Sequence, residues 1–202
     1  MIDLISAICR DVDADPVPDA LVTRATALAA RALTPEEARA AWAEMVPALR
    51  LYRLDPEFLV ASALIYEKCR EVEGMLVFWA NVQMLCPDST MALRMLMRWY
   101  RRMKMVYEGV KHLSDIHVDW TDDAVVAERK FQGYVELHAI DMVDGLMADF
   151  LAAHPDALAM RLRYVKHLVK LGRVSDASQI GAAIIDRHAI GLAAQTLLAE
   201  VD

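Results

Sequence analysis

Four arginines lie close together in the segment STMALRMLMRWYRR, which covers residues 89–102. On a helix, Arg94, Arg98, Arg101 and Arg102 share one stripe, because residues three and four apart are neighbours on a helical surface. The planar guanidinium of arginine matches carboxylate and phosphate groups with two parallel hydrogen bonds. The stripe is therefore a candidate binding surface for an anion: an acidic peptide, a C-terminal carboxylate or a phosphorylated group.

The positive charges of this arginine stripe also admit an internal explanation. Like charges on one helix stripe repel one another by roughly a few tenths of a kcal/mol per pair unless something neutralises them. The glutamates that could do so from neighbouring segments are Glu67, Glu71, Glu128 and Glu136. A mixed interpretation pairs Arg94 and Arg98 internally and leaves Arg101 and Arg102 for a partner, and the sequence does not decide among the three.

The histidines and cysteines form no pattern typical of a metal or catalytic site. His112 and His117 are five residues apart, whereas two zinc ligands on one helix face are three or four apart. Cys9, Cys69 and Cys86 lack a Cys-x-x-Cys spacing and are predicted to be buried free thiols. No glycine-rich phosphate loop or Gly-x-Ser-x-Gly motif is present. We therefore expect no metal, no cofactor and no catalysis from this chain.

The composition favours a helical protein that works in the cytoplasm. Of 202 residues, 56% are hydrophobic and only seven are glycine and seven proline, which favours helices. The net charge of −7 argues against nucleic acid as the partner. No apolar run reaches the roughly 18 residues of a membrane span. The N-terminal sequence MIDLISAICRDVD has no basic leader, so we expect no signal peptide and a cytoplasmic location.

Polar breaks that contain a proline and an acidic residue recur along the chain. They occur at Pro18, Pro56, Pro87 and Pro155. The gaps between them are 38, 31 and 68 residues, and 68 is twice 34. This spacing predicts a further break near Thr121, in VDWTDDA, and another near Ala189. Between breaks the apolar residues follow two helical stripes, so each unit is expected to be a helix pair that buries its apolar face by stacking on its neighbours.

Local signals predict where several of these helices begin and end. Thr34 and Glu37 have the spacing of a capping box at the start of a helix. After Pro155, an apolar stripe from Leu158 to Val169 predicts a helix that Gly172 ends. Ser175 is expected to cap the next helix. The buried side of that helix is predicted to contain Ile180, Ile184 and Ile185.

The segment HPDALAMRLRYVKHLVKLGRVSDASQIGAAII resembles a tetratricopeptide-type repeat. In that family a small residue early in the second helix lets the paired helices approach closely. The position 22 residues after each break contains Ala40, Gly109 and Ala177, but also Phe78 and Val143, which depart from the pattern. The resemblance implies an all-α fold in one domain over residues 1–202: a right-handed α-solenoid of about five antiparallel helix pairs, preceded by a short N-terminal helix.

The same resemblance implies that the first helix of each pair lines a concave groove. Its groove positions fall 4, 7, 11, 14 and 15 residues after each break. The partner-binding residues expected on this basis are Met91, Arg94, Arg98, Arg101, Arg102, Lys166 and Lys170. The opposite stripe of the arginine helix is expected to form core through Leu93, Leu96, Met97 and Tyr100.

Two functions are compatible with this sequence. The first is a non-catalytic interaction module that binds a protein or peptide partner, acidic in one interpretation, in its groove. The second is an N-terminal scaffold or oligomerisation domain of a larger bacterial enzyme, such as a surface-polysaccharide glycosyltransferase. The C-terminal sequence IGLAAQTLLAEVD favours the second, because a repeat array usually closes with a polar helix. Its Leu192, Leu197 and Leu198 predict a homodimer formed through this helix.

Overall fold

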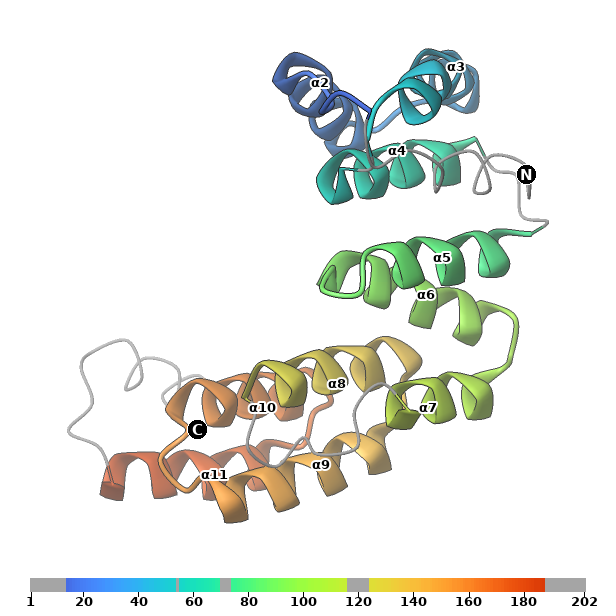
Figure 1. Ribbon diagram of the computed structural model, residues 1–202. Coiled ribbons are helices and arrows are strands. Elements are labelled where there is room, and N and C mark those ends of the chain that lie inside the picture. The colour runs from blue at the N-terminus through green and yellow to red at the C-terminus, as the bar shows by residue number, and fades with distance from the viewer. Residues whose placement is uncertain (1–13, 54, 70–73, 116–123, 188–202) are drawn as a thin grey trace. The chain divides into compact units, whose positions relative to one another are not determined.

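The computed structural model describes residues 14–53, 55–69, 74–115 and 124–187. Within these ranges all the regular secondary structure is α-helical (Figure 1), which confirms the predicted all-α class. The helices are α2 (Asp19–Ala30), α3 (Pro35–Leu51), α4 (Pro56–Lys68), α5 (Met75–Leu85), α6 (Thr90–Arg102), α7 (Val106–Asp115), α8 (Ala124–Leu137), α9 (Ile140–Ala153), α10 (Leu158–Lys170) and α11 (Val174–Arg187). The expected N-terminal helix, the break at Thr121 and the C-terminal leucines lie outside the described residues.

The proline breaks precede helices, as their sequence predicted. Pro18 immediately precedes α2, and Pro56 is the first residue of α4. Asp55 caps α4 by accepting a 2.7 Å hydrogen bond from the amide of Phe58. The capping box at the start of α3 is confirmed, since the Thr34 side chain accepts from the Glu37 amide and the Glu37 carboxylate accepts from the Thr34 amide.

Gly172 ends α10, as predicted, in a left-handed conformation with φ of 74°. The amide of Gly172 donates to the Val169 carbonyl and the amide of Arg173 donates to the Leu168 carbonyl, each at 2.9 Å. The prediction that Ser175 caps the next helix is wrong, because α11 begins at Val174. The glycine turn returns the chain to helical conformation so quickly that Ser175 already lies in the first turn of α11.

The fourth residue of each second helix of the predicted pairs is buried. These residues are Ala38, Phe78, Gly109, Val143 and Ala177. The count of 22 residues from Pro18 predicted Ala40 as the small residue at the contact between paired helices. This prediction is wrong, since Ala40 is exposed whereas Ala38 is fully buried. The number of residues between a proline break and the second helix that follows it varies along the chain. The buried position is therefore found by counting from the first residue of that helix. Small residues occupy this position in three of the five second helices.

The chain forms two compact units, residues 1–111 and 112–202, with the boundary inside α7. In the first unit α4 packs against α2, α3 and α5, and α5 packs against α6. Aromatic rings link three of these helices: Trp42 lies 4.7 Å from Tyr66, and Tyr66 lies 5.1 Å from Phe78, between ring centroids. Lys68 at the end of α4 donates to backbone carbonyls at the end of α2.

In the second unit, α8 packs against α9 and α10 packs against α11. Asp144 of α9 accepts a 2.6 Å hydrogen bond from the Tyr164 hydroxyl of α10. The same carboxylate forms a 2.6 Å ion pair with Arg173, between α10 and α11. Gly133 of α8 lies against the fully buried Leu113, where a Cβ atom would approach the Leu113 side chain to 2.6 Å.

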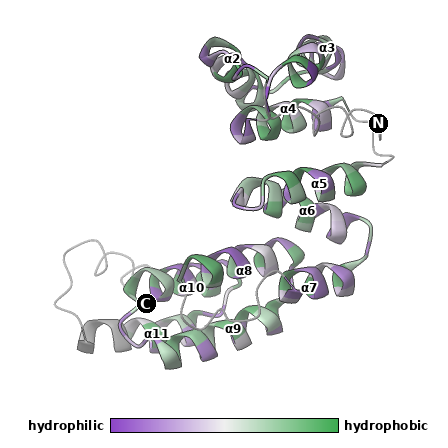
Figure 2. Cartoon of the chain, in the orientation of Figure 1, coloured by the Kyte–Doolittle hydropathy of each residue, from purple (hydrophilic) through white to green (hydrophobic). Residues whose placement is uncertain are grey.

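Hydrophobic and hydrophilic residues both occur on the helices, as Figure 2 shows. The hydrophobic core includes large side chains such as Phe58, Trp79 and Phe150. Across the described ranges, none of the helices has the length and apolar character that would let it cross a bilayer.

Candidate binding surface

The arginine helix, α6, is anchored by its apolar face. Leu93, Leu96 and Met97 are at most 1% exposed, so this part of the predicted core is confirmed, while Tyr100 is half-buried. The helix begins where the Ser89 side chain accepts a 3.2 Å hydrogen bond from the Ala92 amide. Because this face is buried, the arginines lie along the edge of the packed surface of α6.

Of the four arginines, three are half-buried and only Arg102 is exposed. The Arg102 guanidinium lies 4.3 Å from the centroid of the Trp99 ring, a cation–π distance. Its Nη1 atom lies 3.9 Å from Glu67 Oε1. The mixed interpretation assigned Arg102 to a partner, but the residue already lies beside a carboxylate of its own unit. Arg98 places Nη1 3.7 Å from Met95 Sδ.

Glu67 is a largely buried carboxyl group beside this cation–π pair. Burial raises its pKa above the ordinary value, and this effect outweighs the guanidinium of Arg102 and the indole N–H groups of Trp99 and Trp79, which lower the pKa. Both indole N–H groups face the carboxyl group closely enough to favour its ionised form, although neither reaches hydrogen-bond geometry. The cluster therefore links α4, α5 and α6 through a carboxyl group whose ionised form is disfavoured by burial.

The remaining expected residues are distributed over both units. Lys166 and Lys170 are exposed on α10 of the second unit. Glu128 also belongs to the second unit, where it forms a 2.6 Å ion pair with Arg163. Glu136 is half-buried on α8, and Glu71 lies outside the described residues.

Met91 lies in an apolar hollow of about 640 Å³ between α2, α4 and the start of α6. Val60, Ala61 and Leu64 of α4 line the same hollow, together with Ala29 at the end of α2. Val60 and Met91 were both assigned to the fourth position after their proline breaks. The structure thus brings together two residues that were expected at equivalent groove positions of consecutive predicted pairs.

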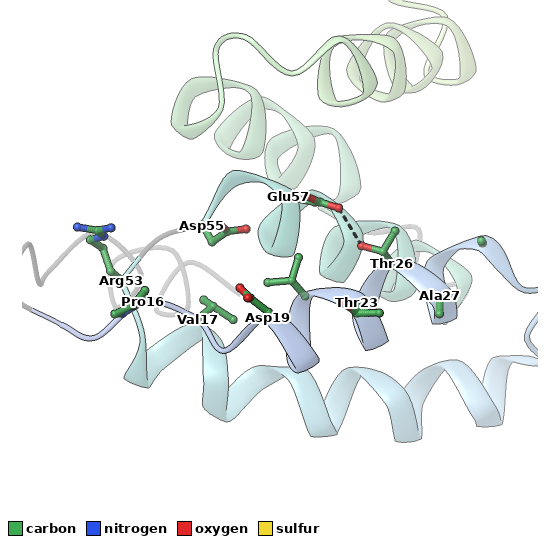
Figure 3. A pocket seen from close by; sticks show the side chains of 11 residues that line it. Pro16, Val17, Asp19, Thr23, Thr26, Ala27, Arg53, Asp55 and Glu57 are labelled. Atoms are coloured by element: carbon green, nitrogen blue, oxygen red, sulfur yellow. Dashed lines mark hydrogen bonds between the residues drawn. The ribbon is translucent and has the colours of Figure 1, made fainter.

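A second hollow, of about 740 Å³, runs along α2 from Asp19 to Ala30 and reaches the start of α4. Figure 3 shows Asp19, Asp55 and Glu57 around it, with Arg53 at one end. The Thr26 hydroxyl donates a 3.4 Å hydrogen bond to Glu57 Oε1. We call these two spaces the apolar hollow and the acidic hollow.

The two hollows adjoin one another, because Thr26, Ala30 and Glu57 line both. Sequence reasoning missed the acidic hollow. Its signal was present in the acidic residues beside Pro18 and Pro56, which were interpreted only as helix starts. Only the packing of α2 on α4 places these carboxylates around one space.

The cysteines and other potential metal ligands do not add a reactive site in the described ranges. Cys69 and Cys86 are buried free thiols, as predicted, and Cys9 lies outside these ranges. Burial raises the pKa of the Cys86 thiol, which disfavours the nucleophilic thiolate. No group of three or more histidine, cysteine, aspartate or glutamate side chains is arranged to hold a metal ion among the residues that the structure describes.

No family model, curated protein or solved structure matches this sequence or fold.

Proposed function

We propose that this chain is a non-catalytic interaction module built from tetratricopeptide-like helix pairs in a right-handed α-solenoid. In this proposal a segment of a protein partner binds along the first helices of the pairs, in the apolar hollow and the acidic hollow. The observation that carries the proposal is that Val60 and Met91, expected at equivalent groove positions, line one apolar hollow.

The composition of the apolar hollow supports binding of an apolar group. Alanine, valine, leucine and methionine side chains make up most of its lining, and the hydroxyl and carboxylate side chains of Thr26, Glu57, Asp88 and Ser89 complete it. Met91 is 42% exposed, and an unbranched methionine adapts its shape to different ligands. The buried free thiols of Cys69 and Cys86 suit a reducing compartment, so we place the module in the cytoplasm.

The second candidate function remains the non-catalytic scaffold of a larger bacterial enzyme, such as a surface-polysaccharide glycosyltransferase. The apolar residues Leu192, Leu197 and Leu198 favour it, because clustered apolar side chains are typical of interfaces between protein copies or domains. Light scattering tests association with a second copy of the chain. A homodimer that becomes monomeric when Leu197 and Leu198 are changed to Ser supports association through this segment. A monomer at high concentration contradicts it.

Panning a random-peptide phage library against the purified full chain tests the interaction module. Ala30 is exposed and lines both hollows, so Ala30→Trp fills the site without disturbing the core. The matched control is Ala40→Trp, on an exposed position of α3. We expect enriched peptides whose binding is lost on Ala30→Trp and kept on Ala40→Trp. A library that yields no enriched peptide contradicts the proposal.

A further inference from the structure

We infer that the segment bound in the two hollows is basic, with a lysine or arginine close in sequence to a large apolar residue. This inference rests on the proposed function and specifies the chemistry of the partner. It differs from the expectation based on the arginine stripe, which favoured an acidic segment.

The apolar hollow defines half of the ligand. Its lining by Val60, Leu64 and Met91 leaves partly exposed apolar surface in a concave space. Covering such surface with an apolar side chain removes it from water, which is the main favourable contribution to binding. A volume of about 640 Å³ accommodates a large aliphatic or aromatic side chain.

The acidic hollow defines the other half. Asp19, Asp55 and Glu57 contribute three carboxylates to its lining, against one guanidinium from Arg53. In Figure 3 Arg53 lies at one end of this space, and the carboxylates lie between it and Ala27. A negative potential confined in a hollow attracts a cation and disfavours an anion. The hollow is therefore complementary to a lysine or arginine side chain.

Glu57 joins the two halves of the ligand site. It lines both hollows, and its hydrogen bond from Thr26 holds the carboxylate at their junction. A segment whose apolar side chain fills the apolar hollow thus presents neighbouring residues to the carboxylates. Because an extended chain advances about 3.3 Å per residue, the basic and apolar residues should be close in sequence.

The arginine stripe points to the competing occupant, an acidic segment. Arg101 and Arg102 lie at the far end of α6 from Met91 and are not among the residues lining either hollow. Arg102 also lies 3.9 Å from Glu67 Oε1 and packs on the Trp99 ring, so its guanidinium already has contacts within its own unit. Charge therefore favours a basic occupant for the hollows. The peptide-binding experiment also detects the alternative, an acidic occupant.

The peptides enriched from the library are synthesised with a fluorescein label, and their affinities are measured by fluorescence anisotropy. We expect basic and apolar sequences whose affinity falls at least about tenfold on Ala30→Trp, the loss of one well-packed apolar contact. Glu57→Gln should weaken binding about two- to fivefold, as for an exposed ion pair. Added salt should weaken it further, because the carboxylates are screened.

Matched controls are Ala40→Trp and Glu36→Gln, both on exposed positions of α3, and neither should change the affinity. Circular dichroism establishes that each variant keeps its helical content. Basic peptides that bind Ala30→Trp and Glu57→Gln as tightly as the unchanged chain overturn the inference. Acidic peptides that depend on Arg101 and Arg102 overturn it as well, while preserving the proposed interaction module. A library without enriched peptides overturns both proposals.

Discussion

The hydroxyl of Tyr164 donates a 2.6 Å hydrogen bond to Oδ1 of Asp144, while Oδ2 of the same carboxylate accepts from Arg173 at 2.6 Å. One carboxylate thus joins α9, α10 and the turn before α11. Arg173 extends the network to Asp176, which it contacts at 2.7 Å. Hydrogen bonds to an ionised partner are stronger than neutral ones, so this network is a strong tie within the second unit.

Replacing Tyr164 by Phe should destabilise the protein by about 1.5–3 kcal/mol, because a hydrogen bond to a charged group is lost at a buried position. Tyr164 is 7% exposed, so water does not readily replace the hydroxyl. Urea unfolding followed by circular dichroism measures the change. Tyr107→Phe is the control, since Tyr107 is 77% exposed and its replacement should leave the unfolding midpoint nearly unchanged. Equal effects of the two replacements would contradict this assignment.

Ala38 and Ala177 should each reject a larger side chain, because both are fully buried at the fourth position of a helix. We expect Ala38→Leu and Ala177→Leu to cost about 1–3 kcal/mol each through overpacking. Ala40→Leu is the matched control on an exposed position of the same helix as Ala38, and it should be nearly neutral. Chemical denaturation tests the register: greater damage from Ala40→Leu than from Ala38→Leu would show that burial follows the proline breaks.

Gly133→Ala is expected to destabilise the second unit, although alanine favours a helix by about 1 kcal/mol relative to glycine. The new Cβ atom would lie 2.6 Å from one Cδ atom of Leu113 and 2.8 Å from the other. Leu113 is fully buried and has little room to move. In a Leu113→Ala background the contact is gone, so Gly133→Ala should become stabilising. The same sign in both backgrounds, measured by urea unfolding, would exclude this contact as the cause.

The effect of Glu67→Gln on the free energy of unfolding should be more favourable at neutral pH than at acidic pH. Burial raises the pKa of Glu67, so the folded state binds this proton more tightly than the unfolded state. Its contribution to stability therefore falls as pH rises from the ordinary glutamate pKa of about 4.3 through the raised value. Glutamine imitates the neutral form and removes this loss. The difference in unfolding free energy between variant and unchanged chain, measured from pH 4 to 8, should increase with pH.

Glu37→Gln provides a control of opposite sign for this pH profile. The backbone and side-chain hydrogen bonds with Thr34 lower the pKa of Glu37. Ionised Glu37 therefore contributes stability above the unfolded-state pKa, and this contribution is lost as pH falls through the folded-state pKa. The variant should therefore lose stability relative to the unchanged chain as pH rises towards the ordinary glutamate pKa of about 4.3, and the difference should be nearly constant above about pH 6. Parallel profiles for Glu67→Gln and Glu37→Gln would show that burial does not govern Glu67.

Several features of this protein were determined by short stretches of sequence. The capping box of Thr34 and Glu37 and the glycine turn at Gly172 appear in the structure where the sequence predicted them. Caps and glycine turns act through hydrogen bonds between residues at most a few positions apart, so their effects can be inferred locally. The apolar periodicity likewise predicted the all-α class, because a helix repeats every 3.6 residues wherever it packs.

Tertiary structure alone decided which surfaces these helices form. It buried Ala38 rather than Ala40, because the start of each helix and its packing, rather than a count from proline, set which side faces the core. It also brought Asp19 and Glu57 around one hollow and placed Glu67 beside Arg102. These residues are more than 30 positions apart in sequence, and only side-chain packing between helices determines how such residues meet.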